Sequence, residues 1–137
     1  MPKAVKKFRH NYLLIISTFV VIVIFSMTTC KTEGPGGKAT IRSVVKHDTT
    51  LIPVTIVYIK YGTEKSPGTD PSDYDDSRMA DSLAKVEFNG LQKGNYFLYA
   101  VGYDSAVSSV NPNVFGSITL RIRKRSETIG FDIGVFE

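Results

Sequence analysis

Four carboxylates and a tyrosine fall within one short stretch, at Asp70, Asp73, Tyr74, Asp75 and Asp76. Carboxylate oxygens are typical Ca²⁺ ligands, and a site needs about six to eight oxygens. The stretch lacks the glycine and the distal glutamate of an EF-hand loop, so a solvated acidic loop is the simpler interpretation and Ca²⁺ the alternative. We expect no metal here, and we take these residues as a candidate binding loop for a cationic partner surface.

The sequence after Cys30 offers no set of catalytic residues. Nucleophilic catalysis needs a base beside a Ser, Thr or Cys, and the one histidine in this part is His47, in an expected turn where it would be solvated. Zinc needs three or four ligands, and no glycine-rich phosphate loop precedes a helix. We therefore predict a protein that is not an enzyme and carries no cofactor.

The densest group of cations after the leader is Arg121-Ile122-Arg123-Lys124-Arg125. At strand spacing, Arg121 and Arg123 point to the same face. The simplest interpretation is a solvated edge that discourages pairing with other strands. A contact with anionic sugar, lipid or nucleic acid is the alternative.

Residues 1–29 have the layout of an export signal. Residues 1–11 carry four bases and no acid, and residues 12–25 are apolar except for Ser17 and Thr18. A few small or modest residues then precede Cys30, the only cysteine. This order of regions is typical of a secretory signal peptide. A membrane span needs about 20 apolar residues, and the charge-free run from residue 11 to 29 approaches that length, so an uncleaved single-pass helix is the alternative.

The segment Met27-Thr28-Thr29-Cys30 resembles the lipobox of bacterial lipoproteins, in which an apolar residue and two small residues precede the cysteine that receives lipid. Thr29 stands where Gly, Ala or Ser is usual, and Met27 where Leu is usual. The resemblance implies cleavage before Cys30 and a lipid such as palmitate on its sulfur. Because Lys31 rather than Asp follows, it also implies the outer membrane, on the periplasmic or cell-surface face.

The net charge of +4 arises in the leader. Four of the 17 Lys and Arg lie in residues 1–11, so the remaining 13 balance the 13 Asp and Glu. A neutral domain lacks the basic footprint of a nucleic-acid-binding protein. We expect a membrane partner through the lipid, an unidentified protein or glycan partner, and no nucleic acid.

Beyond a flexible, Gly-rich tether at 30–37, residues 38–137 show the alternation of β-strands. Six strands are expected, or seven if 107–115 forms one. Their expected positions are 38–46, 54–61 behind Pro53, 84–89, 96–103, 118–123 and 129–135. This pattern predicts an all-β, antiparallel sandwich. The connection 62–82, with a helical turn expected at 77–83, is long enough to predict a mobile recognition loop.

The segment from Phe88 to Leu98 resembles the φ-x-G-L-x-x-G-x-Y-x-L stretch of transthyretin-like, carboxypeptidase-regulatory and collagen-adhesin B-type domains. Gly90 and Gly94 would allow tight-turn backbone angles. Leu91 would close the end of the sandwich, and Tyr96 would send its hydroxyl back to turn backbone, as in a tyrosine corner. The resemblance implies an immunoglobulin-like sandwich and leaves function open.

The sequence lacks the C-terminal Tyr-Arg-Gly-Ser and the histidines of transthyretin-like hydrolases, so that activity is not implied. We expect an exported, membrane-anchored lipoprotein with a non-catalytic module that binds protein or glycan through 62–82 and 105–113. The alternative function is an accessory subunit of a membrane-bound enzyme or assembly.

The lipobox interpretation predicts that Cys30→Ser blocks lipidation and leaves the precursor uncleaved. The sulfur is the acceptor of the lipid, and serine offers no thiol for that transfer. Intact-mass spectrometry of the protein isolated from membranes checks this. An intact leader without acyl chains on the wild-type protein would show that the leader is a retained helix.

Overall fold

The computed structural model describes residues 33–105 and 112–137; the leader, Cys30 and most of the 105–113 loop lie outside this part. It contains eight strands and a short 3₁₀ turn, η1. Their bounds are β1 Pro35–His47, β2 Thr50–Leu51, β3 Ile56–Tyr61, η1 Pro71–Asp73, β4 Asp76–Met79, β5 Lys85–Leu91, β6 Gly94–Tyr103, β7 Asn113–Ile122 and β8 Thr128–Gly134. The described residues include no helix with the length and apolar character to cross a bilayer.

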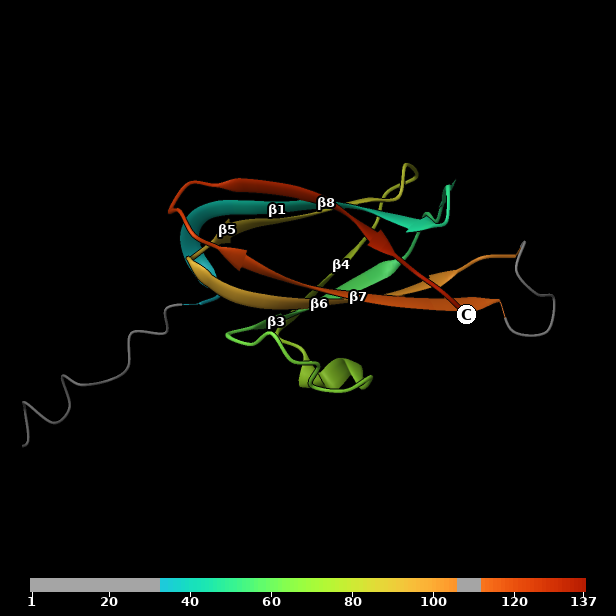
Figure 1. The fold of residues 1–137 in the computed structure, drawn as a ribbon, viewed down its shortest axis with the longest axis horizontal. Coiled ribbons are helices and arrows are strands. Elements are labelled where there is room, and N and C mark those ends of the chain that lie inside the picture. Colours follow the sequence, from blue (N-terminus) through green and yellow to red (C-terminus); the bar gives the residue numbers. More distant parts are fainter. Residues whose placement is uncertain (1–32, 106–111) are drawn as a thin grey trace, which may run out of the picture. The chain divides into compact units, whose positions relative to one another are not determined.

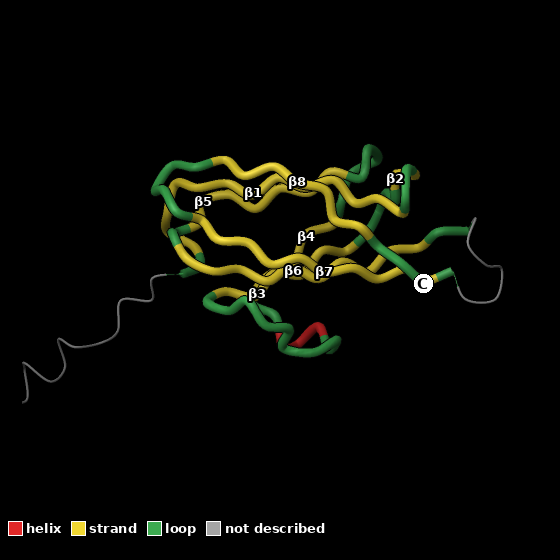
Figure 2. The backbone as a smooth tube through the Cα atoms, in the orientation of Figure 1, coloured by secondary structure: helices red, strands yellow, loops and turns green. Residues whose placement is uncertain are grey.

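The strands form two sheets that pack face to face as a sandwich (Figures 1 and 2). Sheet A holds β2, β1, β5 and β8, and sheet B has the order β4-β3-β6-β7. The predicted alternation of β1 is confirmed, since Ala39, Ile41 and Val45 are fully buried between the sheets. Facing them from sheet B are Val57, Ile59, Tyr96 and Leu98. The all-β sandwich predicted from the sequence is therefore confirmed.

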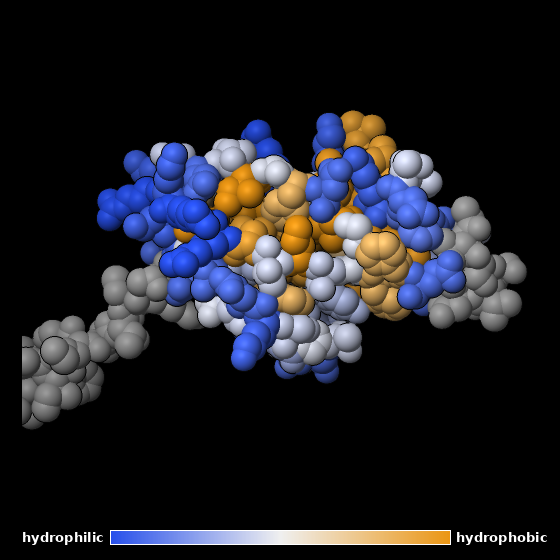
Figure 3. All heavy atoms as spheres, in the orientation of Figure 1, coloured by the Kyte–Doolittle hydropathy of each residue, from blue (hydrophilic) through white to orange (hydrophobic). Residues whose placement is uncertain are grey.

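The expectation of purely antiparallel sheets is wrong for β8, which pairs with β1 in parallel, from Thr40 opposite Thr128 to Lys46 opposite Gly134. After β7 the chain crosses from sheet B to sheet A through residues 123–127 and takes the free edge of β1. Beyond β8 the chain returns to sheet B, where Phe136 and Phe115 of β7 exchange two backbone hydrogen bonds of 2.7 and 2.8 Å. Apolar surface is visible along this side of the sandwich (Figure 3).

Several strand limits differ from the sequence prediction. β3 begins at Ile56 rather than 54, because Val54 has a positive φ of 60° in a turn and is 63% exposed. β1 begins at Pro35, so the last residues of the predicted tether are already part of the sheet. Val114 and Phe115 belong to β7 instead of forming a separate strand.

Tyr96 ties three parts of the fold together. Its ring is fully buried, and its hydroxyl donates to the carbonyl of Gln92 at 2.7 Å. The same oxygen accepts the backbone N–H of Gly34 at 3.0 Å. The first contact is the bond to turn backbone expected of a tyrosine corner. The second fixes the start of β1 against the β5–β6 hairpin.

The other residues of this motif shape the hairpin between β5 and β6. Gly90 has φ of +69° and Gly94 φ of +148°, conformations that L side chains rarely adopt. Leu91 is 3% exposed and belongs to the core. The hairpin therefore has the backbone angles that the sequence predicted for it.

The long connection 62–82 is more structured than the sequence predicted. Residues 76–79 form strand β4, whereas the sequence predicted the end of a loop and the start of a helical turn. Strand β4 pairs antiparallel with β3, from Ile56 opposite Met79 to Ile59 opposite Asp76. The sequence Asp-Ser-Arg-Met has no apolar alternation and little preference for a strand. It forms one because the edge of β3 offers backbone hydrogen-bond partners that would otherwise stay unpaired. Replacing the whole connection by a short turn would therefore remove an edge strand.

The segment before β4 lies over the outer face of sheet B (Figures 1 and 2). The ring of Tyr74 packs on three rings of that face, with centroids 5.5 Å from Tyr58, 5.9 Å from Tyr99 and 6.4 Å from Phe97. Its hydroxyl donates to the carbonyl of Gly68 at 2.8 Å. Tyr74 therefore holds the segment onto the sheet.

We predict that Tyr96→Phe lowers the free energy of unfolding by about 1–3 kcal/mol, because it leaves the buried N–H of Gly34 without an acceptor. Tyr96→Ala should cost about 3–5 kcal/mol, since it also empties the ring's site. Denaturant unfolding measures both. Tyr103→Phe, which alters a tyrosine that is 64% exposed, is the control and should change little.

The same substitution should change the response to alkaline pH. Burial raises the pKa of Tyr96, so the folded protein binds this proton more tightly than the unfolded chain does. Its contribution to stability is full below about pH 10 and falls as the pH rises through the folded pKa. Tyr96→Phe should lose less stability above pH 10 than the wild type. Equal losses would contradict this role of Tyr96.

We predict that Tyr74→Ala frees the 62–75 segment and lowers stability by about 2 kcal/mol, through the loss of ring packing. Limited proteolysis should then cut within this segment, while Tyr74→Phe, which keeps the ring, should resist like the wild type. If the alanine variant also resisted, the ring would not be what holds the segment.

Candidate functional site

The outer face of sheet B is the most distinctive surface in the described part of the chain. Because side chains alternate along a strand, every second residue of β6 and β7 points away from the core. The outward residues of β6 are Phe97, Tyr99, Val101 and Tyr103, and those of β7 are Phe115, Ser117, Thr119 and Arg121. The two strands pair with Tyr99 opposite Ser117 and Val101 opposite Phe115.

Four rings on this face form an aromatic row, defined as Tyr58, Tyr74, Tyr99 and Phe115. Tyr99 lies between Tyr74 and Phe115, with interplanar angles of 16° and 7° and a centroid distance of 6.4 Å to Phe115. Tyr58 stacks beside Tyr99 at 6.4 Å. The 62–75 segment covers one end of the row. At the other end Phe115 is 39% exposed and neighbouring Tyr103 is 64% exposed.

Aligned rings of this kind suit a flat, partly apolar ligand. An aromatic face carries partial negative charge, which attracts the C–H groups on the apolar face of a sugar ring. Ser117 and Thr119 are exposed beside the row and can donate to or accept from ligand hydroxyls. Large exposed apolar patches that are rimmed by polar residues mark interaction or ligand-binding surfaces.

Tyr74 and Tyr99 are neutral hydrogen-bonding groups at physiological pH. Burial raises the pKa of Tyr99, and the neighbouring Tyr58 adds to this effect. Burial likewise raises the pKa of Tyr74. Their hydroxyls therefore stay protonated and act as donors, with no chemistry that depends on a tyrosinate.

The structure places the acids of the candidate binding loop in separate local roles. Asp70 caps η1 and accepts from the N–H and hydroxyl of Ser72, bonds that lower its pKa. Asp75 accepts from the N–H of Tyr61 at 2.7 Å and pairs with Lys60. Two further acids make local contacts: Asp76 pairs with Arg78, and Asp73 lies beside Gly68.

These contacts hold the 62–75 segment in place. They do not gather the carboxylates into a cage, because no group of three or more His, Cys, Asp or Glu suited to a metal occurs in the described residues. A direct contact of these acids with a partner stays a prediction.

His47 is not the solvated turn residue that the sequence suggested. It is the last residue of β1, and its Nδ1 lies 2.9 Å from the carboxylate of Asp104, with the side chains 18% and 9% exposed. The pair lies near the base of the 105–111 loop, where the N–H of Asp104 donates to the carbonyl of Pro112. This contact joins the two sheets.

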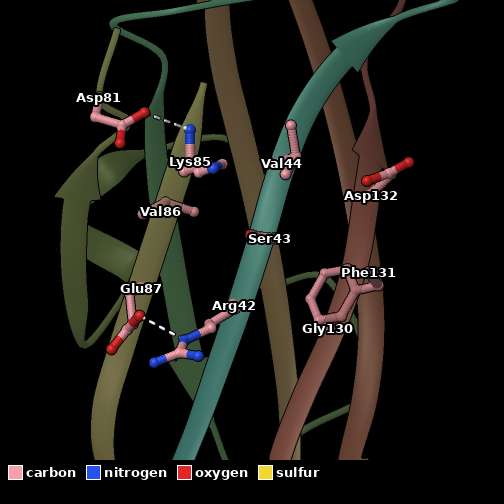
Figure 4. Close-up of a pocket in the computed structure, with 10 residues that line it drawn as sticks. All are labelled: Arg42, Ser43, Val44, Asp81, Lys85, Val86, Glu87, Gly130, Phe131 and Asp132. Carbon is pink, nitrogen blue, oxygen red and sulfur yellow. Dashed lines mark hydrogen bonds and ion pairs between the residues drawn. The ribbon is translucent and has the colours of Figure 1, made fainter. Parts of the chain in front are cut away.

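A second candidate surface is a depression of about 520 Å³ on the outer face of sheet A (Figure 4). Arg42 and Glu87 form an ion pair across it at 2.6 Å, and Asp132 pairs with Lys46 at 2.7 Å. The Asp81 carboxylate accepts the backbone N–H of Lys85. Because most of its charges are already satisfied, this surface offers a ligand less than the aromatic row does.

Of the residues in the aromatic row, only Tyr74 was predicted from the sequence as a binding residue. The aromatic run 96–103 was visible, but a strand that is apolar on both faces is also typical of a buried central strand. The useful signal is the position of the aromatics in that run. Tyr99 and Tyr103 share the face opposite to Tyr96, and only one face can point into the core.

A search of protein-family models and curated proteins finds no match to this chain. Among the solved structures that share its fold are two bacterial proteins. A candidate carbohydrate-binding protein from Pseudomonas aeruginosa aligns with a TM-score of 0.53 and 12% identity over 74% of this chain and 91% of the other. The major pilin subunit BcpA of Bacillus cereus aligns with a TM-score of 0.51 and 8% identity over 74% of this chain but 30% of its own. The chain is thus similar in fold to β-rich domains of bacterial proteins.

Proposed function

We propose that this protein is a non-catalytic glycan-binding module, held at the outer membrane by a lipid on Cys30. The binding surface is the outer face of sheet B, where Tyr99, Phe115 and Tyr103 stack on sugar rings. Ser117 and Thr119 supply hydrogen bonds to sugar hydroxyls.

The aromatic row carries this proposal. Neighbouring rings of Tyr74, Tyr99 and Phe115 keep their planes within 16° of each other, the offset-stacked arrangement that aromatic pairs favour. The 62–75 segment and the core fix the rings before any ligand arrives. Fixed rings lower the entropy cost of binding.

Two further observations support the proposal. The similar structure from Pseudomonas aeruginosa is a candidate carbohydrate-binding protein, although 12% identity carries only the fold. The leader and the lipobox-like segment favour a lipid anchor, which would present the module to envelope or extracellular glycans. The transthyretin-like resemblance of the Gly90–Tyr96 segment fits the same module without assigning it a ligand.

The test is binding of the full chain, purified in detergent, to a panel of immobilised neutral and acidic polysaccharides. The double variant Tyr103→Ala/Phe115→Ala removes two exposed rings. Each ring contact contributes about 1 kcal/mol, so affinity for the bound glycan should fall tenfold or more.

Leu51→Ala is the matched control, because Leu51 is 43% exposed and lies on β2 of sheet A. Its affinity should equal that of the wild type, and circular dichroism should show all three proteins folded. No binding to any polysaccharide, or equal binding by the double variant, would reject the proposed function.

A further inference from the structure

A second feature lies at the far end of the same face. Lys93, Arg121 and Arg123 line a hollow of about 470 Å³ together with Gly94 and Ile122. We call these three cations and the space between them the basic hollow. All three side chains are exposed.

The fold brings the three cations together from two separate segments. β6 starts at Gly94, opposite Ile122, and its next residue Asn95 lies opposite Arg121. Lys93, just before Gly94, therefore lies next to Arg123, just beyond Ile122. Arg121 and Arg123 are two residues apart and point to the same side. Lys124 and Arg125 follow directly and are also exposed.

Two acids, Glu127 and Glu33, lie near the hollow, which is fewer than the three cations that line it. Glu127 uses its carboxylate to accept the N–H groups of Arg123 and Lys124 at 2.8 and 2.9 Å, and these bonds lower its pKa. Glu33 lies beside Gly94. Among the ion pairs of the described residues, none involves the cations of the hollow. The like charges repel one another, and an anion bound between them would relieve this repulsion.

The hollow is continuous with the aromatic row. Along β7 the outward positions run from Phe115 through Ser117 and Thr119 to Arg121, a distance of about 20 Å. A sugar chain that stacks on Phe115 and lies along β7 would pass the two hydroxyls and then reach the cations. The guanidinium groups present forked donors that match a planar carboxylate.

We propose that the basic hollow binds the carboxylates of an acidic polysaccharide, so that the ligands of this module are uronate-containing glycans. This inference rests on the proposed function and specifies its substrate class. It also gives a role to the basic cluster 121–125 beyond that of a solvated edge.

The experiment compares oligogalacturonate with its methyl ester, which has the same rings and no charge, both immobilised on a sensor surface. The full chain in detergent should bind the acid form at least tenfold more tightly, and this preference should shrink as salt rises. Arg121→Gln/Arg123→Gln should abolish the preference while keeping affinity for the ester. Lys38→Gln/Lys85→Gln removes the same charge from exposed positions on sheet A and should keep the preference.

The outcomes separate the two proposals. If the arginine variant keeps the preference for the acid form, the hollow does not bind uronate, and the glycan module stands. If the preference depends on the arginines but neither polymer depends on Tyr103 and Phe115, the hollow is an anion site and the proposed function fails. Duplex DNA immobilised in the same way tests specificity. If the arginine variant loses binding to DNA to the same degree as it loses binding to the acid polysaccharide, the inference is overturned, because the hollow then attracts any polyanion.

Discussion

The rest of the structure depends on β6 carrying large apolar side chains on both faces. Its inner residues, Tyr96, Leu98 and Ala100, need sheet A as a cover and are fully buried. Its outer residues Phe97 and Tyr99 need a second cover, which Tyr74 supplies from the 62–75 segment. This cover ends at Tyr99, so the remaining aromatics of the face, Tyr103 and Phe115, stay in contact with solvent. The candidate site is thus the uncovered half of a surface whose other half is held fixed.

The sequence predicted what depends on alternation and on local turn chemistry. The inner row of β1 follows from alternation. The bond of the Tyr96 hydroxyl to turn backbone, which the structure places at the carbonyl of Gln92, was expected from the resemblance of the 88–98 segment to known domains. Strand β4 could not be predicted from the sequence, because Asp76–Met79 has no apolar period. It is a strand because it pairs with the edge of β3. The parallel pairing of β8 was missed for a related reason, since alternation fixes which face is buried but says nothing of a strand's partner or direction.

The candidate site shows the same limit. Acids at 70–76 are conspicuous in a sequence, yet the structure uses several of them to cap η1 and to pair with Lys60 and Arg78. The aromatic row contains Tyr58, Tyr99 and Phe115 from three different strands, and only strand register brings these together.

The zero net charge of residues 30–137 also conceals an uneven distribution of acids and bases. The acids of the 70–76 stretch lie before and at the start of β4, whereas the basic hollow lies between the start of β6 and the end of β7, so a neutral domain still has an uneven charge distribution.

The parallel pair of β1 and β8 has a kinetic consequence. Thr40 pairs with Thr128 and Lys46 with Gly134, so this pair links strands that lie near the two ends of the described residues. Closing so large a loop costs entropy before any pairing energy is gained, and domains dominated by such distant contacts fold in about milliseconds to seconds. While the chain is still growing, β1 lacks the strand that completes its edge. A nascent chain of this kind therefore remains without its finished sheet until β8 is made.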